Sequence, residues 1–241
     1  MPGTDDCTRK AGSRRPPRLR RAPGPIAFVA LLLCSFPLLA VQPAAVTFSL
    51  NFPGSDPDHY SISVQSDGSA VYECSAKISN DSDDREAYQA AFKFTEATRA
   101  RIFDLAAQAG YFAGKIDSGK KNLAFTGAKK LAYKDAQHDF VADYNFSPQP
   151  AVQQLTALFQ SVAATADFGR RLTYYHRYQK LALDDELKRM EDQARRGDLA
   201  ELQAVAPILE EIFDDPSVMN VVRARAQRIM EMGKSNAARP R

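Results

Sequence analysis

Cysteine is scarce in this 241-residue chain, which contains only Cys7, Cys34 and Cys74. Two of the three lie within the first 45 residues, so Cys74 stands alone in the rest of the sequence. A single cysteine cannot form an internal disulfide, which excludes a disulfide-stapled fold. We therefore expect the folded part to depend on its apolar core. Cys74 alternates with Tyr72 and is expected to be a buried thiol that packs as a small apolar side chain.

Histidine is equally scarce, and the common catalytic motifs are missing. None of His59, His138 and His176 has a second histidine or a cysteine at the spacing of metal ligands. The sequence contains no G-x-S-x-G, H-E-x-x-H or C-x-x-C motif. We accordingly predict no catalytic, cofactor-binding or metal-binding residues, and no cofactor. The sequence favours a binding protein over an enzyme.

Two segments approach known sites but lack essential parts. Residues 114–121 (GKIDSGKK) nearly match the phosphate-binding G-x-x-x-x-G-K-[ST] motif, but Lys121 replaces the hydroxyl residue. A helix is expected before this segment and a strand after it, the reverse of what the motif requires. The acidic run at 80–84 lacks the central glycine and the ligand spacing of a calcium loop. We expect an exposed loop at the first segment and an acidic turn at the second.

Positive charge in excess is confined to the N-terminus. The whole chain has a net charge of +3, but the residues after position 45 carry 25 basic and 27 acidic side chains, a net of −2. The folded part therefore has no charge signature of a nucleic-acid-binding protein, and we predict no nucleic-acid partner.

The N-terminus has the layout of an export signal. Seven basic residues precede an uncharged apolar run from Ile26 to Val41. We predict that residues 1–45 are a signal peptide or a membrane anchor. The run is at the lower limit of what spans a bilayer, so cleavage and retention both stay open. The chain is expected to be exported to the periplasm or the cell exterior of a bacterium, with residues 26–45 anchoring it in the inner membrane if they are retained.

The next segments predict an α+β domain. Residues 46–58 contain Pro53, Gly54 and Pro57 and are interpreted as a linker. Residues 59–165 combine strands of period-two alternation with two helices, of which the first is capped by Thr95 and the second begins near Pro150. We predict two halves, each of three strands followed by a helix. Leu123 and Phe125 belong to the fourth predicted strand, and the fold is an antiparallel sheet with helices on one face.

Residues 166–233 are predicted to be an all-α region, followed by a disordered tail at 234–241. Asp184 and Gly197 are expected to begin and end one helix, Asp198 to begin the next, and Pro207 to kink or break it. The dipeptide at 215–216 is expected to begin the last helix, and Gly233 to end it.

Two resemblances accompany this organisation. The last two helices resemble one unit of a HEAT-type repeat, on the strength of their apolar positions Leu202, Val205, Leu209, Ile212, Val218, Val222, Ala226 and Ile229. Residues 60–112 resemble secreted bacterial domains of unknown function, which implies export without implying an activity.

Two clusters suggest an interaction surface. Lys120, Lys121, Lys129 and Lys130 belong to a run of six lysines between positions 115 and 134 that could hold an anionic partner. The alternative is a solvated hairpin edge, where lysines discourage aggregation. Tyr174 and Tyr178 lie one helical turn apart and could form a partner-binding face. The alternative for these tyrosines is packing between the helical region and the sheet domain.

Taken together, these patterns predict an exported or membrane-anchored envelope protein that is a non-enzymatic protein- or polymer-binding module. The expected partner is an envelope protein or an anionic polymer, with membrane contact through the N-terminal segment if that segment is uncleaved. The alternative is an envelope hydrolase, or an inhibitor of one, with a site assembled from distant residues. The sequence leaves the oligomeric state open.

Overall fold

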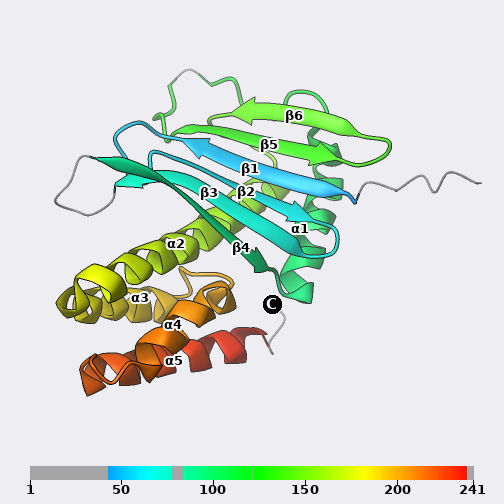
Figure 1. Ribbon diagram of the computed structural model, residues 1–241. Helices are drawn as coiled ribbons and strands as arrows, with labels where there is room; N and C mark the ends of the chain where they lie inside the picture. Colours follow the sequence, from blue (N-terminus) through cyan, green and yellow to red (C-terminus); the bar gives the residue numbers. More distant parts are fainter. Residues whose placement is uncertain (1–42, 78–83, 121, 238–241) are drawn as a thin grey trace, which may run out of the picture. The chain divides into compact units, whose positions relative to one another are not determined.

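The computed structural model describes residues 43–77, 84–120 and 122–237. Six strands form one antiparallel sheet in the order β4-β3-β2-β1-β5-β6 (Figure 1). The strands are β1 (Ala45–Asn51), β2 (His59–Gln65), β3 (Ser69–Lys77), β4 (Arg85–Lys93), β5 (Ala128–Lys134) and β6 (Asp139–Tyr144).

Five α-helices and three short 3-10 turns complete the described part of the chain. The helices are α1 (Glu96–Gln108), α2 (Pro150–Tyr178), α3 (Leu183–Arg196), α4 (Ala206–Asp214) and α5 (Asn220–Ala237). The turns are η1 (Gly110–Phe112), η2 (Lys180–Ala182) and η3 (Leu202–Val205). Helices α1 and α2 cover one face of the sheet, and the described helices leave the other face open (Figure 1). The predicted α+β class is confirmed.

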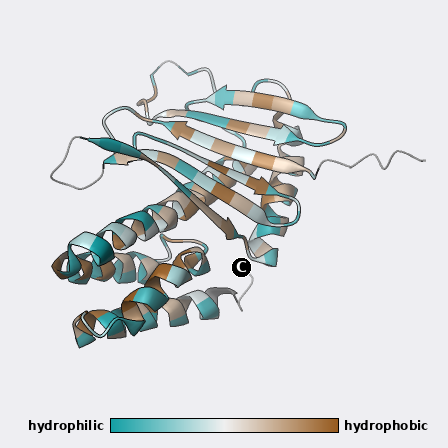
Figure 2. Cartoon of the chain, viewed as in Figure 1, coloured by the Kyte–Doolittle hydropathy of each residue, from teal (hydrophilic) through white to brown (hydrophobic). Residues whose placement is uncertain are grey.

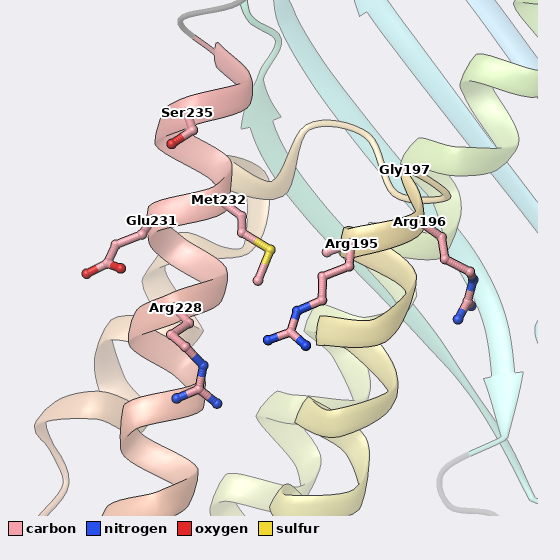
Figure 3. A pocket seen from close by; sticks show the side chains of 8 residues that line it. Arg195, Arg196, Gly197, Arg228, Glu231, Met232 and Ser235 are labelled. Atoms are coloured by element: carbon pink, nitrogen blue, oxygen red, sulfur yellow. The ribbon is translucent and has the colours of Figure 1, made fainter.

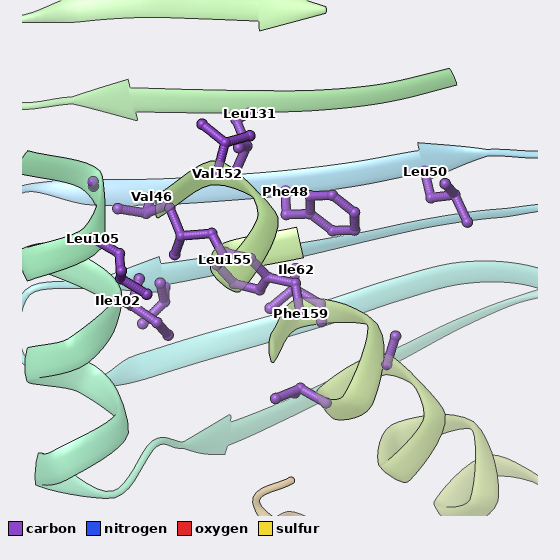
Figure 4. Packing of buried hydrophobic residues seen from close by; sticks show 14 of the residues in the cluster. Val46, Phe48, Leu50, Ile62, Ile102, Leu105, Leu131, Val152, Leu155 and Phe159 are labelled. Atoms are coloured by element: carbon purple, nitrogen blue, oxygen red, sulfur yellow. The ribbon is translucent and has the colours of Figure 1, made fainter. Parts of the chain in front are cut away.

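Alternation along the strands separates the two faces of the sheet, as the change of colour along each strand in Figure 2 shows. On β1, Val46, Phe48 and Leu50 are buried, because consecutive side chains of a strand point to opposite faces. Phe48 stacks on Phe159 of α2 with ring centroids 5.4 Å apart, and this pair lies at the centre of the core in Figure 4. Cys74 is buried in the same core, as predicted, and burial raises the pKa of its thiol.

The interpretation of residues 46–58 as a linker is wrong. Residues 45–51 form β1, which pairs with β2 on one side and β5 on the other near the middle of the sheet. The proline- and glycine-rich part is only the short connection between β1 and β2, closed by a hydrogen bond from the Phe52 N–H to the Asp58 carbonyl (2.7 Å). The alternation of Val46, Phe48 and Leu50 outweighs the turn residues that follow it.

The prediction of two equal halves is also wrong, because four strands precede α1 and two precede α2. β1 is the additional strand of the first group. Leu123 and Phe125 lie in an exposed loop instead of a strand. Phe140 is 36% exposed because the edge strand β6 has a neighbour on one side only, and Phe146, which follows the end of β6, is 42% exposed.

The predicted boundary at 165/166 lies inside one continuous helix. Helix α2 extends over 29 residues without a break. Its first half packs in the core of the sheet through Val152, Leu155 and Phe159. Its second half packs in a separate core of the helical region through Phe168, Leu172 and Tyr175. The apolar stripe continues through the boundary with no proline to end the helix, so both cores share this element.

Three predicted helix ends in the C-terminal region need correction. Asp184 lies within the first turn of α3, although Gly197 ends that helix as predicted, with φ of 79°. Pro207 lies in the first turn of α4, where its missing N–H costs no helical hydrogen bond. Helix α5 begins at Asn220 and continues through Gly233 to residue 237, so 234–237 are helical. Residues 238–241 of the predicted tail lie outside the described residues.

Gly169 marks the tightest approach between α2 and η3. A Cβ atom at this position would lie 2.6 Å from Cγ1 of Val205, a stiff β-branched side chain. We expect Gly169→Ala to destabilise the protein, because overpacking costs about 1–3 kcal/mol and the gain in helix propensity is only about 1 kcal/mol. In a Val205→Ala background, the same substitution should become stabilising. Urea denaturation of the four proteins checks this, and an effect of the same sign in both backgrounds would contradict it.

Candidate functional site

Several predicted features lie outside the described residues. These are the N-terminal segment 1–42, Lys121 and most of the acidic run, residues 80–83. Within the described ranges, no helix combines the length and apolarity needed to cross a membrane. The same ranges contain no group of three or more His, Cys, Asp or Glu residues arranged to hold a metal ion.

The predicted lysine cluster is divided among three environments. Lys120 lies in the loop between η1 and β5 and is exposed. Lys130 lies on the open face of the sheet, with its Nζ 3.6 Å from Oδ1 of Asp143. Lys129 points to the opposite face and is only 5% exposed. The prediction that Lys129 belongs to an exposed basic patch is therefore wrong, since neighbouring residues of a strand point to opposite faces.

Lys129 has a structural task in the described fold. Its Nζ donates to the Thr126 hydroxyl (2.7 Å), the Asn145 carbonyl (3.0 Å) and the Thr126 carbonyl (3.2 Å). Desolvation by burial lowers its pKa. The ammonium group ties the loop before β5 to the end of β6. Sequence reasoning missed this role because one of the oxygens, the Asn145 carbonyl, comes from a segment 16 residues away.

We expect Lys129→Met to release this loop. The substitution removes the donor and leaves buried carbonyl oxygens unsatisfied, which should lower the free energy of unfolding by about 1–3 kcal/mol. Hydrogen exchange of the amides at 122–127 should become faster than in the unmodified protein. Lys120→Met is the matched control, because this exposed side chain should contribute less than about 0.5 kcal/mol. Equal effects of the two substitutions would contradict the assignment.

The loop that Lys129 secures presents apolar side chains to solvent at one end of the sheet. We name this surface the aromatic end, and it consists of Phe52, Leu123, Phe125 and Phe146 with Lys115 and Lys120 beside them. Phe52 and Phe125 meet edge to face with centroids 5.9 Å apart. Phe125 is 58% exposed. The aromatic end lies where β1 and β6 finish and β5 begins.

Asp117 orders this loop from within. Its carboxylate accepts N–H groups from Gly119 (2.7 Å), Asn145 (3.0 Å) and Phe146 (3.3 Å). These bonds hold its pKa below the usual value for aspartate. Buried Ile116 anchors the loop beneath. The bonds to Asp117 tie the turn at 117–119 to Asn145 and Phe146, and the Asn145 side chain in turn binds the Thr126 N–H (3.2 Å) and the Ala124 carbonyl (3.1 Å). As expected, the nearly matching phosphate motif at 114–121 follows a helical turn and precedes a strand.

A second polar cluster surrounds His138 in the turn that joins β5 to β6. This turn lies at the other end of these two strands from the aromatic end. Both carboxylate oxygens of Asp135 lie 3.1 Å from Nδ1 of His138, and the Tyr133 hydroxyl donates to Oδ2 (3.1 Å). Tyr111 stacks on the imidazole at 4.5 Å and has φ of 55°, an unusual backbone conformation for tyrosine. An Asp–His pair can orient an imidazole as a base. The described contacts of this pair include no serine, threonine or cysteine nucleophile.

The acid dependence of stability tests the role of Asp135. Hydrogen bonds from the Gln137 N–H and from His138 lower its pKa to about 2 from the ordinary 3.8. The stabilisation is therefore present above pH 3.8 and lost as the pH falls through about 2. We expect Asp135→Asn to be less stable than the unmodified protein at neutral pH, with the difference vanishing between these values. Urea midpoints measured against pH check this. A stability difference that does not change with pH would contradict it.

An open pocket of about 500 Å³ lies between the end of α3 and the C-terminal half of α5 (Figure 3). Arg195, Arg196 and Arg228 line it, but each already pairs with a carboxylate. Arg195 and Arg228 bind Glu191 at 2.6 and 2.9 Å, and Arg196 binds Asp198 at 2.8 Å. The C-terminus of α3, the negative end of its dipole, also faces this region. These charges disfavour an anionic ligand here.

The predicted tyrosine pair belongs to the helical region. Tyr174 packs against the core of that region, and its ring lies 5.2 Å from the ring of Tyr178. Tyr178 is 62% exposed. Tyr175 is buried, as expected for its place in the apolar stripe. Tyr174 therefore packs within the helical region, and not between that region and the sheet domain as the alternative had it, whereas the Tyr178 ring is largely open to solvent.

A search against protein-family models gives no match. A search of curated proteins also finds none. The candidate sites are therefore interpreted from their geometry alone.

Proposed function

We propose that this chain is an exported or membrane-anchored envelope protein whose folded part is a non-enzymatic binding module, and that the aromatic end is its docking surface. The observation that supports this proposal is the exposure of Phe52, Leu123, Phe125 and Phe146 on three connections at one end of the sheet, where the Phe52 and Phe125 rings meet. Single exposed apolar residues are common on protein surfaces, but a contiguous group is typical of an interaction site. The export part of the proposal rests on the sequence of residues 1–45.

The chemistry of the aromatic end indicates the kind of partner. Exposed phenylalanine rings favour burial against apolar groups, and aromatic residues supply much of the energy at protein interfaces. Lys115 and Lys120 add positive charge beside them, while the carboxylate of Asp117 is occupied by backbone N–H groups. The surface thus suits a partner that offers both apolar and anionic groups, either an acidic envelope protein or an anionic polymer.

Site-specific photocrosslinking in intact cells tests for a protein partner. A benzophenone amino acid at position 125 should give one major adduct, and adding Phe146→Ser and Lys120→Glu should abolish it. The matched control places the same probe at Leu181, the most exposed large apolar residue at 83%, far from the aromatic end in sequence. The same adducts from both positions would argue against a specific surface.

Binding to immobilised polyglutamate, with neutral dextran as reference, tests for a polymer partner. An anionic polymer should bind the unmodified full chain and lose affinity to the Phe146→Ser, Lys120→Glu variant, with binding that weakens as salt rises. Leu181→Ser should leave binding unchanged. The absence of both a position-125 adduct and polymer binding would refute the proposed function.

A further inference from the structure

The open face of the sheet carries a pattern that neither the core nor the aromatic end uses. Its side chains come from alternate positions of all six strands, and none of them is buried. The two central strands place no Asp, Glu, Lys or Arg on this face. Their side chains are Ala45, Thr47, Ser49, Asn51, His59, Ser61, Ser63 and Gln65. Charged residues begin at β3 on one side and β5 on the other.

The strand register arranges these side chains in rows that cross the sheet. One row contains Gln89, Glu73, Ser61, Ser49, Lys130 and Asp143, in order from β4 to β6. Its neighbour contains Ala91, Val71, Ser63, Thr47, Ala132 and Val141. In the row beyond it, Lys93 and Ser69 lie on one side, Gln65 and Ala45 in the middle, and Lys134 and Asp139 on the other side, where Lys134 pairs with Asp139 at 2.9 Å.

We propose that this open face is the interface of a two-fold symmetric homodimer in which the sheets of two copies pack face to face. The axis is parallel to the strands and passes between β1 and β2. Such an axis places β1 over β2 of the second copy, β3 over β5 and β4 over β6, and it keeps each row opposite itself. A two-fold interface of this kind requires one surface to be complementary to itself.

The rows meet this requirement. Glu73 faces Lys130 of the second copy, and Lys93 faces Asp139. In the row between these pairs, Val71 faces Ala132 and Ala91 faces Val141, so apolar groups meet apolar groups. Near the axis, Ser63 faces Thr47, and these two hydroxyls are already linked at 3.1 Å within one copy.

Glu73 carries the electrostatic part of the proposal. It accepts a hydrogen bond from Gln89 (3.1 Å), and no described lysine or arginine forms an ion pair with it. Lys130 of the second copy would supply that cation. This axis keeps the central strands of the two copies parallel, and the long lysine and glutamate side chains can bridge the offset that the twist of each sheet produces away from the axis.

The dimensions agree with a dimer interface. Five strand spacings and seven residues give a face of about 24 by 23 Å, and the small central side chains allow sheets to approach to about 10 Å. Because protruding side chains add to the accessible surface, the area buried on each copy would approach the roughly 800 Å² per partner of a standard interface. The same axis would place both aromatic ends on one side of the dimer, where a multivalent partner could bind them together.

Sedimentation velocity of the full chain in a mild detergent tests the proposal by charge exchange. The unmodified chain should be a dimer. Glu73→Lys and Lys130→Glu should each raise the dimer dissociation constant by about tenfold or more, because like charges then face each other. The two substitutions together should restore it to within about threefold of the original, because the pair is exchanged but complementary.

Two further variants keep the result interpretable. Thr47→Arg introduces a bulky charge near the axis and should give a monomer, with near-UV circular dichroism confirming that it is folded. Lys188→Glu, at an exposed position on α3, should leave the dimer intact. A monomeric unmodified chain overturns the proposal. So does a dimer that is insensitive to the face variants, or single variants that weaken the dimer without recovery in the double variant.

Discussion

Arg171→Met should lower the free energy of unfolding by about 3 kcal/mol, because it removes one of the two guanidinium groups from each of two buried carboxylates. The Arg171 guanidinium binds Oε1 of Glu186 at 2.7 Å and also binds Asp167. The Glu186 side chain is fully buried. After the substitution Asp167 retains Arg170 (2.9 Å) and Glu186 retains Arg189, so each carboxylate keeps one cation. Urea denaturation followed by circular dichroism measures the change.

A double variant separates the lost charge from the lost packing. Arg171→Met with Glu186→Leu removes both members of the pair and should recover stability to within about 1 kcal/mol of the unmodified protein, because apolar side chains often replace a buried ion pair without loss. Arg177→Met on the same helix is the control. Its guanidinium lies over the exposed Tyr178 ring at 5.2 Å and should contribute less than about 1 kcal/mol. No recovery in the double variant would contradict this interpretation.

Phe159→Ala should be of similar magnitude, with a loss of about 3–5 kcal/mol. The side chain is fully buried and its ring is nearly parallel to that of Phe48, at an angle of 3°. The substitution opens a cavity at the place where α2 meets the sheet. Phe159→Leu retains most of the volume and should cost less than about 1.5 kcal/mol.

The matched control for this series is Phe146→Ala. The same atoms are removed from a side chain that is 42% exposed, so stability should change by less than about 0.5 kcal/mol. This variant should instead affect binding at the aromatic end. A large loss of stability from Phe146→Ala would show that its ring packs more deeply than the structure describes, and a small loss from Phe159→Ala would contradict the assigned core.

Features determined by neighbouring residues could be predicted from the sequence. Thr95 caps α1 by accepting the N–H of Thr98, and Gly197 ends α3 in a left-handed conformation. The hairpin at Asp67-Gly68 and the burial of Cys74 follow from the same local rules. In each case, the physical cause lies within a few residues of the position concerned.

Features determined by distant residues could not be predicted in this way. The alternation at 45–51 is a local signal for a strand, but the place of this strand inside the sheet depends on pairing with β5, which lies about 80 positions later in the chain. Burial of Lys129 depends on a carbonyl at Asn145. Glu201 accepts a hydrogen bond from the Thr95 N–H (2.8 Å) across a separation of 106 residues. Leu123 and Phe125 of the aromatic end alternate along the sequence as they would in a strand. Periodicity alone therefore could not show that they lie in a loop, which is joined to Asn145 by hydrogen bonds.

Helix α2 couples the stability of the two ends of the folded part. It contributes to both hydrophobic cores over a length of about 43 Å, and the folded part forms a single compact unit. Neither core can lose its share of this helix without exposing apolar surface, so the sheet and the C-terminal helices should unfold in one cooperative transition. A partner that binds only the native sheet then also protects α5 from unfolding, because mass action acts on the whole cooperative unit. The melting temperature of the entire chain thus reports on ligands that never touch its C-terminal half.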